Sequence, residues 1–299
     1  MIQVLTPREV PLGGPRAMKV RRTLPHKDRS LIGAWCFADH YGPERSRMDV
    51  APHPHTGLQT VSWLFSGEIE HRDSVGSHAM GSHAMVRPGE LNLMTAGHGI
   101  SHSEVSTPQT DILHGMQLWV ALPAVSRFVA PTFEHYMPEP VTAPGLAARV
   151  FLGTVLGETS PVSTYTPLLG AEMVLDAGAR VTLEVDPTFE HGIIVDRGSL
   201  TLADADLSAA ELGYVEPGEH ELHLHNSTQE PVRFLLLGGP PFGEQIVMWW
   251  NFVGRSHEDV VEYRAAYEAE NGQFGTVEGY PGPRLHAPEL PNARMKPRG

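Results

Sequence analysis

The chain has 299 residues, of which 41% are hydrophobic and 19% are charged, as expected for a globular protein. Its formal net charge of -13 argues against direct binding to nucleic acid or to an anionic membrane surface, both of which attract basic proteins. The length favours two domains, and the 30 glycines and 26 prolines predict the many turns of an all-β fold.

The N-terminal segment and the cysteine content bear on the cellular compartment. Residues 1–9 lack the basic region and apolar core of a signal peptide, and no apolar run reaches transmembrane length. The only cysteine, Cys36, excludes an intrachain disulfide and lies in an apolar run, where we expect a buried, unreactive thiol. We therefore expect a cytoplasmic protein.

The first signature of metal-ligand type is His53-Pro54-His55. Side chains two residues apart on a strand point to the same side, so both imidazoles can face one centre. Pro54 cannot donate a hydrogen bond to a neighbouring strand, which predicts a strand entrance or an edge strand here. A single His-x-His is a weak signal, because histidines are common at strand ends.

Several segments alternate between two faces and predict half-buried strands. Residues 61–66 show this pattern first, and residues 180–185 and 221–225 repeat it later in the chain. Many short strands at close spacing predict a sandwich or a barrel. Turn-type sequences separate the strands: Ser66-Gly67, Pro88-Gly89, Asp176-Ala177-Gly178, Arg197-Gly198 and Pro217-Gly218.

A tandem repeat of Gly-Ser-His-Ala-Met occupies residues 76–80 and 81–85, between two predicted strands. We interpret it as a slipped duplication that lengthens a hairpin loop. Its histidines, His78 and His83, could act as ligands, but histidines in a loop usually face solvent. We expect both of them to be exposed and to bind no metal.

The second signature of metal-ligand type is His102-Ser103-Glu104, which follows the strand-like residues 90–94. Together with His53 and His55 it supplies three imidazole nitrogens and one carboxylate. Such a mixed set suits iron, manganese, nickel or copper. The separation of the two signatures is too long for a local loop, so the site requires a tertiary fold, which we predict to be a small β-barrel.

The remaining histidines are weaker candidates. His71 either shapes the pocket or an ion pair near it, or makes a structural hydrogen bond. His98 either supports the ligands through a hydrogen bond or faces water. His223 and His225 lie opposite the apolar face of a strand and should face solvent. The second half offers only a lone His191, and we predict that it binds no metal.

The two halves of the chain echo each other. Residues 65–69 and 86–91 contain a strand, a glycine turn and a later Pro-Gly-Glu, and residues 195–200 and 215–219 contain the same series. This internal similarity predicts a duplicated β domain. The Pro-rich stretch from Pro131 to Pro144 is the expected boundary between the two copies.

We therefore predict four segments. They are an N-terminal metal-binding domain over residues 1–130, a Pro-rich linker over residues 131–147, a C-terminal domain without metal over residues 148–254, and a helix and tail over residues 255–299.

One helix is clear in the last of these segments. Residues 256–259 resemble a capping box, in which Ser256 and Asp259 satisfy each other's backbone. The residues that follow place one apolar face inward, formed by Val260, Tyr263 and Tyr267, and Asn271-Gly272 supplies a stop. Residues 275–299 are rich in proline and glycine, and we expect an extended tail that lies over the surface.

Several motifs in a fixed order resemble the pirin family of the cupin superfamily, and the resemblance covers nearly the whole chain. It implies two tandem cupin-type β-barrel (jelly-roll) domains and one mononuclear metal in the N-terminal domain, of which Fe²⁺ is the expected ion, with manganese, nickel, copper or zinc as alternatives. By motif match the ligands are His53, His55, His102 and Glu104. The motifs lie at residues 53–57, 68–74, 88–91, 94–97, 100–104 and 114–120, and residues 249–253 and the tail resemble bacterial members.

The resemblance also implies an activity. Some members are similar to quercetin 2,3-dioxygenases, which open a flavonol ring with O₂ and release carbon monoxide. We therefore expect a small aromatic substrate and O₂, with Glu104 acting as ligand and as general base. Other members are metal- and redox-sensitive partners of transcription factors, which leaves a regulatory binding protein as the alternative. A metal-free structural remnant is disfavoured by the complete ligand set, and we expect a monomer.

The sequence departs from the family pattern in two places. Gln59 occupies a position that cupin motifs often fill with glutamate, which weakens the expectation of a fifth ligand. The five-residue repeat enlarges a hairpin near the predicted barrel and could alter access to it.

Overall fold

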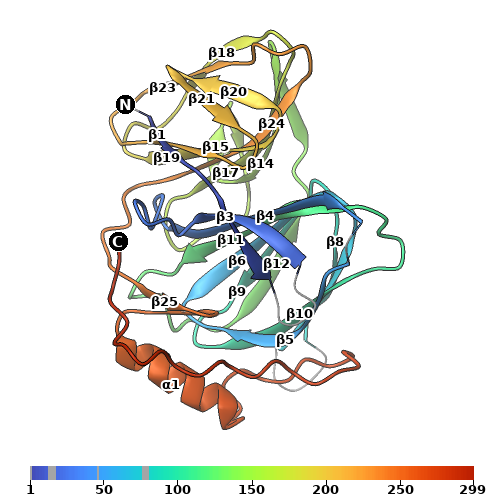
Figure 1. Cartoon of the computed structure of the whole chain (residues 1–299), viewed down its shortest axis with the longest axis vertical. Helices are drawn as coiled ribbons and strands as arrows, with labels where there is room; N and C mark the ends of the chain where they lie inside the picture. Colours follow the sequence, from blue (N-terminus) through green and yellow to red (C-terminus); the bar gives the residue numbers. More distant parts are fainter. Residues whose placement is uncertain (1, 13–17, 46, 76–80) are drawn as a thin grey trace. The chain divides into compact units, whose positions relative to one another are not determined.

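The computed structural model describes residues 2–12, 18–45, 47–75 and 81–299. In this part of the chain nearly all regular structure is strand, with a single helix, which confirms the predicted all-β class (Figure 1). The chain divides into two compact units. Unit 1 comprises residues 1–9, 21–40 and 136–242, and unit 2 comprises residues 10–20, 41–135 and 243–299.

Unit 2 contains the predicted ligands, which lie on a four-stranded antiparallel sheet. The strands of this sheet are, in spatial order, β5 (Asp49–His55), β10 (Ile100–Ser106), β7 (Ile69–Asp73) and β8 (His83–Val86). β5 therefore lies at an edge of its sheet, as Pro54 predicted.

The other large sheet has seven strands, and its first strand and its last three strands have residues in both units. Its strands are, in spatial order, β12 (Thr132–Tyr136), β9 (Leu91–Thr95), β6 (Leu58–Ser66), β11 (Leu113–Ala121), β4 (Trp35–Glu44), β3 (Met18–Leu24) and β2 (Arg8–Leu12). A separate hairpin consists of β25 (Val247–Trp249) and β26 (Phe252–Gly254).

Unit 1 has the same two kinds of sheet. Its seven-stranded sheet contains, in spatial order, β1 (Gln3–Leu5), β22 (Leu212–Val215), β19 (Glu190–Arg197), β24 (Val232–Gly239), β17 (Leu169–Leu175), β14 (Leu146–Leu152) and β13 (Pro140–Ala143). Its four-stranded sheet contains β18 (Arg180–Glu184), β23 (Glu221–His225), β20 (Ser199–Leu202) and β21 (Ala205–Ser208), and a small hairpin contains β15 (Thr154–Val155) and β16 (Glu158–Thr159).

The strand orders confirm the duplication. The order β5-β10-β7-β8 in unit 2 matches β18-β23-β20-β21 in unit 1, and β9-β6-β11 matches β22-β19-β24. Gly67 and Gly198 occupy equivalent turns, both with positive φ. The two Pro-Gly-Glu sequences do not, because residues 88–90 precede β9 whereas residues 217–219 follow β22. That part of the sequence echo reflects a common turn-forming composition rather than equivalent positions.

The strands that were predicted to be half-buried differ in how many of their faces are buried. In β23 the expectation is confirmed, since Leu222 and Leu224 are buried and His223 is exposed. For β6 it was wrong, because Ser62 and Trp63 point to opposite faces and are both buried. The reason is that β6 lies inside its sheet, between β9 and β11, with both faces covered.

The tandem repeat only partly follows its prediction. Its first copy, residues 76–80 with His78, lies outside the described residues. In the second copy residues 83–85 belong to β8 and pair with residues 70–72 of β7, so this half is strand rather than loop. The backbone N–H and C=O groups of β7 pair with this part of the repeat, which adds a strand to the sheet. His83 is exposed, as expected.

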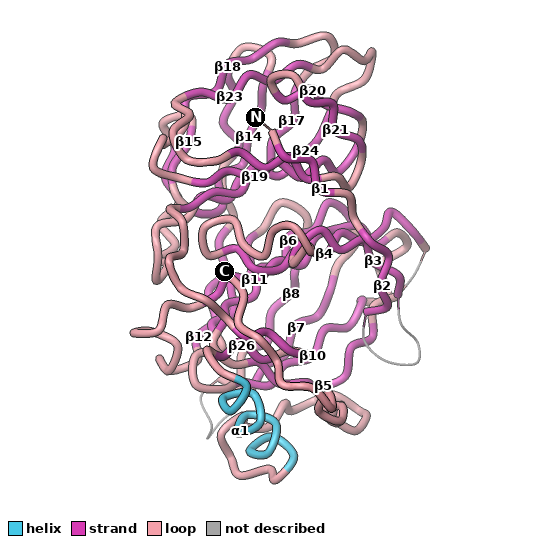
Figure 2. The backbone as a smooth tube through the Cα atoms, turned by 60° about the vertical axis from the view of Figure 1, so that its left-hand side comes forward, coloured by secondary structure: helices cyan, strands magenta, loops and turns pink. Residues whose placement is uncertain are grey.

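The single helix of the described chain, α1 (His257–Glu268), begins as predicted (Figure 2). The Ser256 side chain accepts from the Asp259 backbone N–H and the Asp259 side chain accepts from the Ser256 N–H, which is the predicted capping box. Val260, Tyr263 and Tyr267 are buried. None of the described helices is long and apolar enough to span a lipid bilayer.

The tail lies along β5, within the same unit. The Leu285 backbone N–H donates to the Pro52 carbonyl at 2.7 Å, and the Tyr280 hydroxyl donates to Asp49 at 2.9 Å. These contacts confirm an extended tail on the protein surface (Figure 2).

Replacing the helix cap should weaken α1 selectively. We expect Ser256→Ala to destabilise the helix by about 1 kcal/mol, because one backbone N–H loses its acceptor. Amide hydrogen exchange of residues 257–268 should then quicken by about fivefold. Glu262→Ala, at an exposed position of the same helix, is the matched control. Equal exchange in both variants would contradict a stabilising cap.

Candidate metal centre

The predicted ligands lie on neighbouring strands. In the antiparallel pair β5–β10, His102 is directly opposite His53, and Ile100 is opposite His55. A register shift between His102 and Glu104 sets Glu104 opposite Val50 on β5. In the regular pairing of β10 with β7, Glu104 is opposite His71 and His102 is opposite Asp73. Two signatures far apart in sequence are thus brought together by strand pairing.

The three imidazoles of His53, His55 and His102 form one compact group. The His55 Nε2 and His102 Nε2 atoms are 3.0 Å apart, and the ring centroids of His53 and His102 are 4.3 Å apart. One nitrogen from each ring lies within 4.8 Å of the others, close enough for a shared ion. The geometry therefore places three nitrogen donors around one point.

Glu104 belongs to a second group, which overlaps the first. Ligand atoms of Glu104, His102 and His71 also lie within 4.8 Å of one another. The four predicted ligands thus fall into two groups that share His102, and His71 joins the second one. His71 is the residue whose role the sequence left open between pocket shaping and a structural bond.

Burial sets the protonation of the imidazoles. Loss of hydration lowers the pKa of His53 to about 4 and lowers the pKa of His55 and of His102 well below the usual value. The neighbouring imidazoles act in the same direction, because like charges repel. All three rings are therefore neutral at pH 7, and each has a lone pair available for a metal.

Glu104 has the opposite shift. Burial raises the pKa of its carboxyl group, and the neighbouring His71 and a hydrogen bond from Ser62 partly oppose the rise. The Ser62 Oγ lies 3.2 Å from Glu104 Oε1 and 3.0 Å from Gln117 Oε1. A hydroxyl has one proton, so Ser62 can donate to only one of them at a time. A carboxylate of raised pKa is a better proton acceptor than an exposed one.

His71 lies behind His102. Its Nδ1 atom is 3.5 Å from the His102 Nδ1, and its Nε2 is 3.0 Å from Asp73 Oδ2. The Phe133 ring stacks on it with centroids 4.7 Å apart. This arrangement combines the two roles considered from the sequence, a place beside the pocket and a bond to a carboxylate.

The other candidate histidines lie outside these groups. His98 is exposed, and so is His83, whose ring contacts Glu70 at 2.8 Å. His223 is exposed and His225 is partly exposed. In unit 1, His191 is fully buried with no hydrogen-bond partner for either ring nitrogen, and none of the metal-type groups of the described residues includes it.

Sequence reasoning missed the polar and aromatic residues that surround the ligands. Ser62 contacts Glu104 directly, and Gln117 contacts Ser62. Trp119 packs edge-on against His55 with ring centroids 5.2 Å apart. The available signal was Ser62, a polar residue between the apolar residues Val61 and Trp63. Gln59 makes a hydrogen bond to Thr95 at 2.9 Å, on the face of β6 opposite Ser62.

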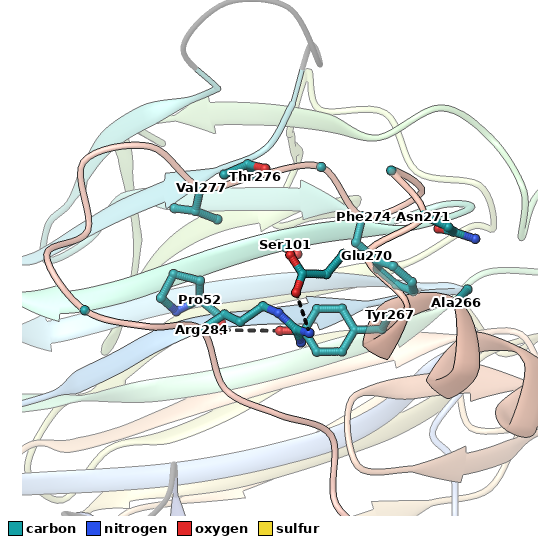
Figure 3. A pocket seen from close by; sticks show the side chains of 13 residues that line it. Pro52, Ser101, Ala266, Tyr267, Glu270, Asn271, Phe274, Thr276, Val277 and Arg284 are labelled. Atoms are coloured by element: carbon teal, nitrogen blue, oxygen red, sulfur yellow. Dashed lines mark hydrogen bonds and ion pairs between the residues drawn. The ribbon is translucent and has the colours of Figure 1, made fainter.

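A cavity of about 330 Å³ lies beside the ligand-bearing strands (Figure 3). Pro52 and Ser101 line it from β5 and β10, and they alternate with His53 and His102 along those strands. The cavity therefore lies on the face of the sheet turned away from the imidazoles. Helix α1 and the tail form its other walls, where Arg284 pairs with Glu270 at 3.2 Å (Figure 3).

The donor set fits a divalent transition metal. Two buried neutral imidazoles that meet Nε2 to Nε2 can satisfy one another through only one proton, whereas a shared cation would engage both lone pairs. Three nitrogens and a carboxylate match the preference of iron, manganese, nickel and copper.

Two barrels of matching strand order, one of them with a buried histidine group, define a two-domain cupin. A crystal structure of quercetin 2,3-dioxygenase from Acinetobacter baumannii matches this chain with a TM-score of 0.91 and 38% identity, covering 99% of this chain and 97% of that one.

The chain belongs to the pirin family. The Pirin family model matches residues 17–120, and the model of the Pirin C-terminal cupin domain matches residues 170–275. A Pseudomonas aeruginosa protein provisionally named a quercetin 2,3-dioxygenase is 40% identical over 97% of this chain and 91% of its own length. A pirin-like protein of Caulobacter vibrioides is 35% identical over 84% of this chain and 88% of its own length.

Removing a central imidazole should abolish metal binding. We expect the wild-type protein to retain about one transition-metal ion per chain, and His102→Ala to retain almost none, because His102 is shared by both groups. Elemental analysis after dialysis measures this. His83→Ala is the matched control, since His83 is exposed and outside both groups. Equal metal content in the two variants would contradict the assignment.

The metal-free protein should lose stability on mild acidification. The folded-state pKa of His53 is about 4 against 6.5 when unfolded, so the unfolded chain binds more protons between these values and stability falls as the pH drops through this window. The contribution of His53 is about 2 kcal/mol between pH 7.5 and pH 5. Urea unfolding of metal-free wild type and His53→Gln at both pH values measures it. The variant should lose less stability, and an equal loss would contradict the shift.

Proposed function

We propose that this protein is a mononuclear metal-dependent dioxygenase of the quercetin 2,3-dioxygenase type, with Fe²⁺ as its resident ion. The observation that carries the proposal is a buried carboxylate of raised pKa, Glu104, next to a buried group of neutral imidazoles. The relatives named as quercetin 2,3-dioxygenases support the same reaction class.

The ligands would be His53, His55 and His102 through their nitrogens and Glu104 through its carboxylate. When bound, a divalent metal supplies a positive charge that favours loss of the flavonol hydroxyl proton, and a redox-active centre for O₂. Neutral imidazoles leave most of that charge uncompensated, so the site keeps its attraction for an oxygen anion.

Glu104 would act as the general base. Its raised pKa brings the carboxylate closer to the working pH, where it can accept a proton and return it within one turnover. Ser62 can hold one carboxylate oxygen through its hydroxyl, so the other oxygen would serve both the metal and the proton transfer. The proton returns to the ring-opened acid, so flavonol and O₂ are consumed and the acid and carbon monoxide are released.

Apolar surroundings would protect the reaction. The rings of Trp119 and Phe133 pack on His55 and His71, and each of the four predicted ligands is at most 6% exposed. Such a site excludes bulk water and limits side reactions of an oxidised intermediate.

Carbon monoxide release tests the activity directly. Protein loaded with Fe²⁺ should release carbon monoxide from quercetin in the presence of O₂, and Glu104→Gln should lower kcat by about 100-fold or more if the base is lost. Metal content of the same samples separates loss of the base from loss of the ion. His83→Ala is the control and should retain wild-type turnover. Fully loaded protein that releases no carbon monoxide from a panel of flavonols would overturn the proposal.

A second function is favoured by one observation. The predicted ligands are almost completely buried, which leaves little room for a flavonol to approach them. A regulatory protein needs only electrons to reach the metal, and its oxidation state could then alter affinity for a protein partner. Hydrogen exchange that differs between the Fe²⁺ and Fe³⁺ forms, without turnover of any flavonol, would support this alternative.

A further inference from the structure

We infer that His71 and Asp73 form a hydrogen-bonded chain that fixes the tautomer and orientation of His102. The inference rests on the proposed metal centre and deepens it. His71 and Asp73 are positioning residues in this view, because they act through His102.

The two nitrogens of His102 face different partners. Its Nε2 lies 3.0 Å from the His55 Nε2, inside the imidazole group, and its Nδ1 lies 3.5 Å from the His71 Nδ1. A neutral imidazole that gives one nitrogen to a metal must hold its proton on the other. If Nε2 of His102 serves the metal, Nδ1 is the donor and His71 Nδ1 is its acceptor.

The chain continues from His71 to a carboxylate. With its Nδ1 accepting, His71 holds its proton on Nε2, which lies 3.0 Å from Asp73 Oδ2. The reverse tautomers would point an imidazole lone pair at the carboxylate oxygen, which is repulsive. One arrangement of protons therefore satisfies all three residues and leaves His102 Nε2 free.

Asp73 is held in place by its second oxygen. Asp73 Oδ1 accepts from the backbone N–H of Val75 at 2.9 Å and of Ser82 at 2.8 Å, and the side chain is fully buried. The carboxylate cannot turn away from His71 without breaking both bonds. One side chain thus joins the backbone of Val75 and of Ser82 to His71.

The same contacts argue against His71 as a direct ligand. His71 lies within reach of an ion shared with His102 and Glu104, but its Nε2 contacts Asp73 and its Nδ1 faces His102. Coordination would break one of these contacts. Phe133 stacked on the His71 ring restrains the rotation that coordination would require.

A pair of isosteric variants tests the chain. His71→Leu removes the acceptor, whereas His71→Asn can place an amide oxygen near the position of Nδ1. We expect His71→Leu to weaken Ni²⁺ binding by 10- to 100-fold, with His71→Asn between it and the wild type. Chelator competition measures the affinity, and circular dichroism with thermal unfolding of the metal-free forms verifies the fold. His83→Ala, at an exposed histidine on β8, is the control. Wild-type affinity in His71→Leu would overturn the inference.

The number of imidazole ligands distinguishes positioning from coordination. X-ray absorption of the Ni²⁺-loaded proteins should give the same imidazole count for wild type and His71→Leu. Loss of one imidazole in the variant would show His71 to be a ligand and would also overturn the inference.

Asp73→Asn supplies an independent variant in case His71→Leu does not fold. It should weaken Ni²⁺ binding in the same direction, and it should speed hydrogen exchange at Val75 and Ser82, because both backbone N–H groups donate to the carboxylate. Unchanged affinity would contradict the chain. These measurements use neither flavonol nor O₂, so a failed carbon monoxide assay leaves them unaffected, and their failure leaves the dioxygenase proposal standing.

Discussion

The removal of three imidazoles and a carboxylate from water is the constraint on which the structure of unit 2 depends. Buried polar groups are costly unless they find partners, and here His55 and His102 meet each other while Ser62 serves Glu104 and the Ala51 carbonyl serves His53. The pairing of β5 with β10 brings them together, because it sets His53 opposite His102. A slip of one residue would turn one signature to the outer face, where Pro52 and Ser101 now lie. The register of this strand pairing therefore determines whether the site forms.

The two barrels show how one topology can serve two purposes. Both have the same order of strands in their four-stranded sheets. In unit 1 apolar side chains fill the core, mostly Leu, Ile and Val, together with Phe234 and Met173. In unit 2 part of the equivalent space holds the histidines. Both units have the same strand order, and the residues that face inward determine whether the interior is an apolar core or a candidate metal site.

Much of this arrangement could be predicted from the sequence. His-x-His and His-x-Glu define same-side pairs on strands whatever the fold, and the duplicated pattern of strands and turns indicated two β domains. The capping box of α1 was equally local, since Ser256 and Asp259 are three residues apart. Each of these predictions depends on short-range geometry.

What could not be predicted depends on pairing between distant strands. Nothing near Glu104 in the sequence indicates that Ser62 and Gln117 lie beside it, because β6 and β11 bring them there. His71 and Asp73 share one side of β7, which is a local signal, but its meaning depends on β10 being the neighbour. The repeat was expected to be a loop because pairing with β7 cannot be read from its composition.

The bonds of Asp73 to Val75 and Ser82 have a consequence for the second copy of the repeat. They hold the backbone just after β7 and just before β8, so Asp73 determines where the repeat joins the sheet. From that point residues 83–85 pair with residues 70–72 of β7 in a single register. A buried carboxylate beside the histidines therefore also determines where the neighbouring strand begins.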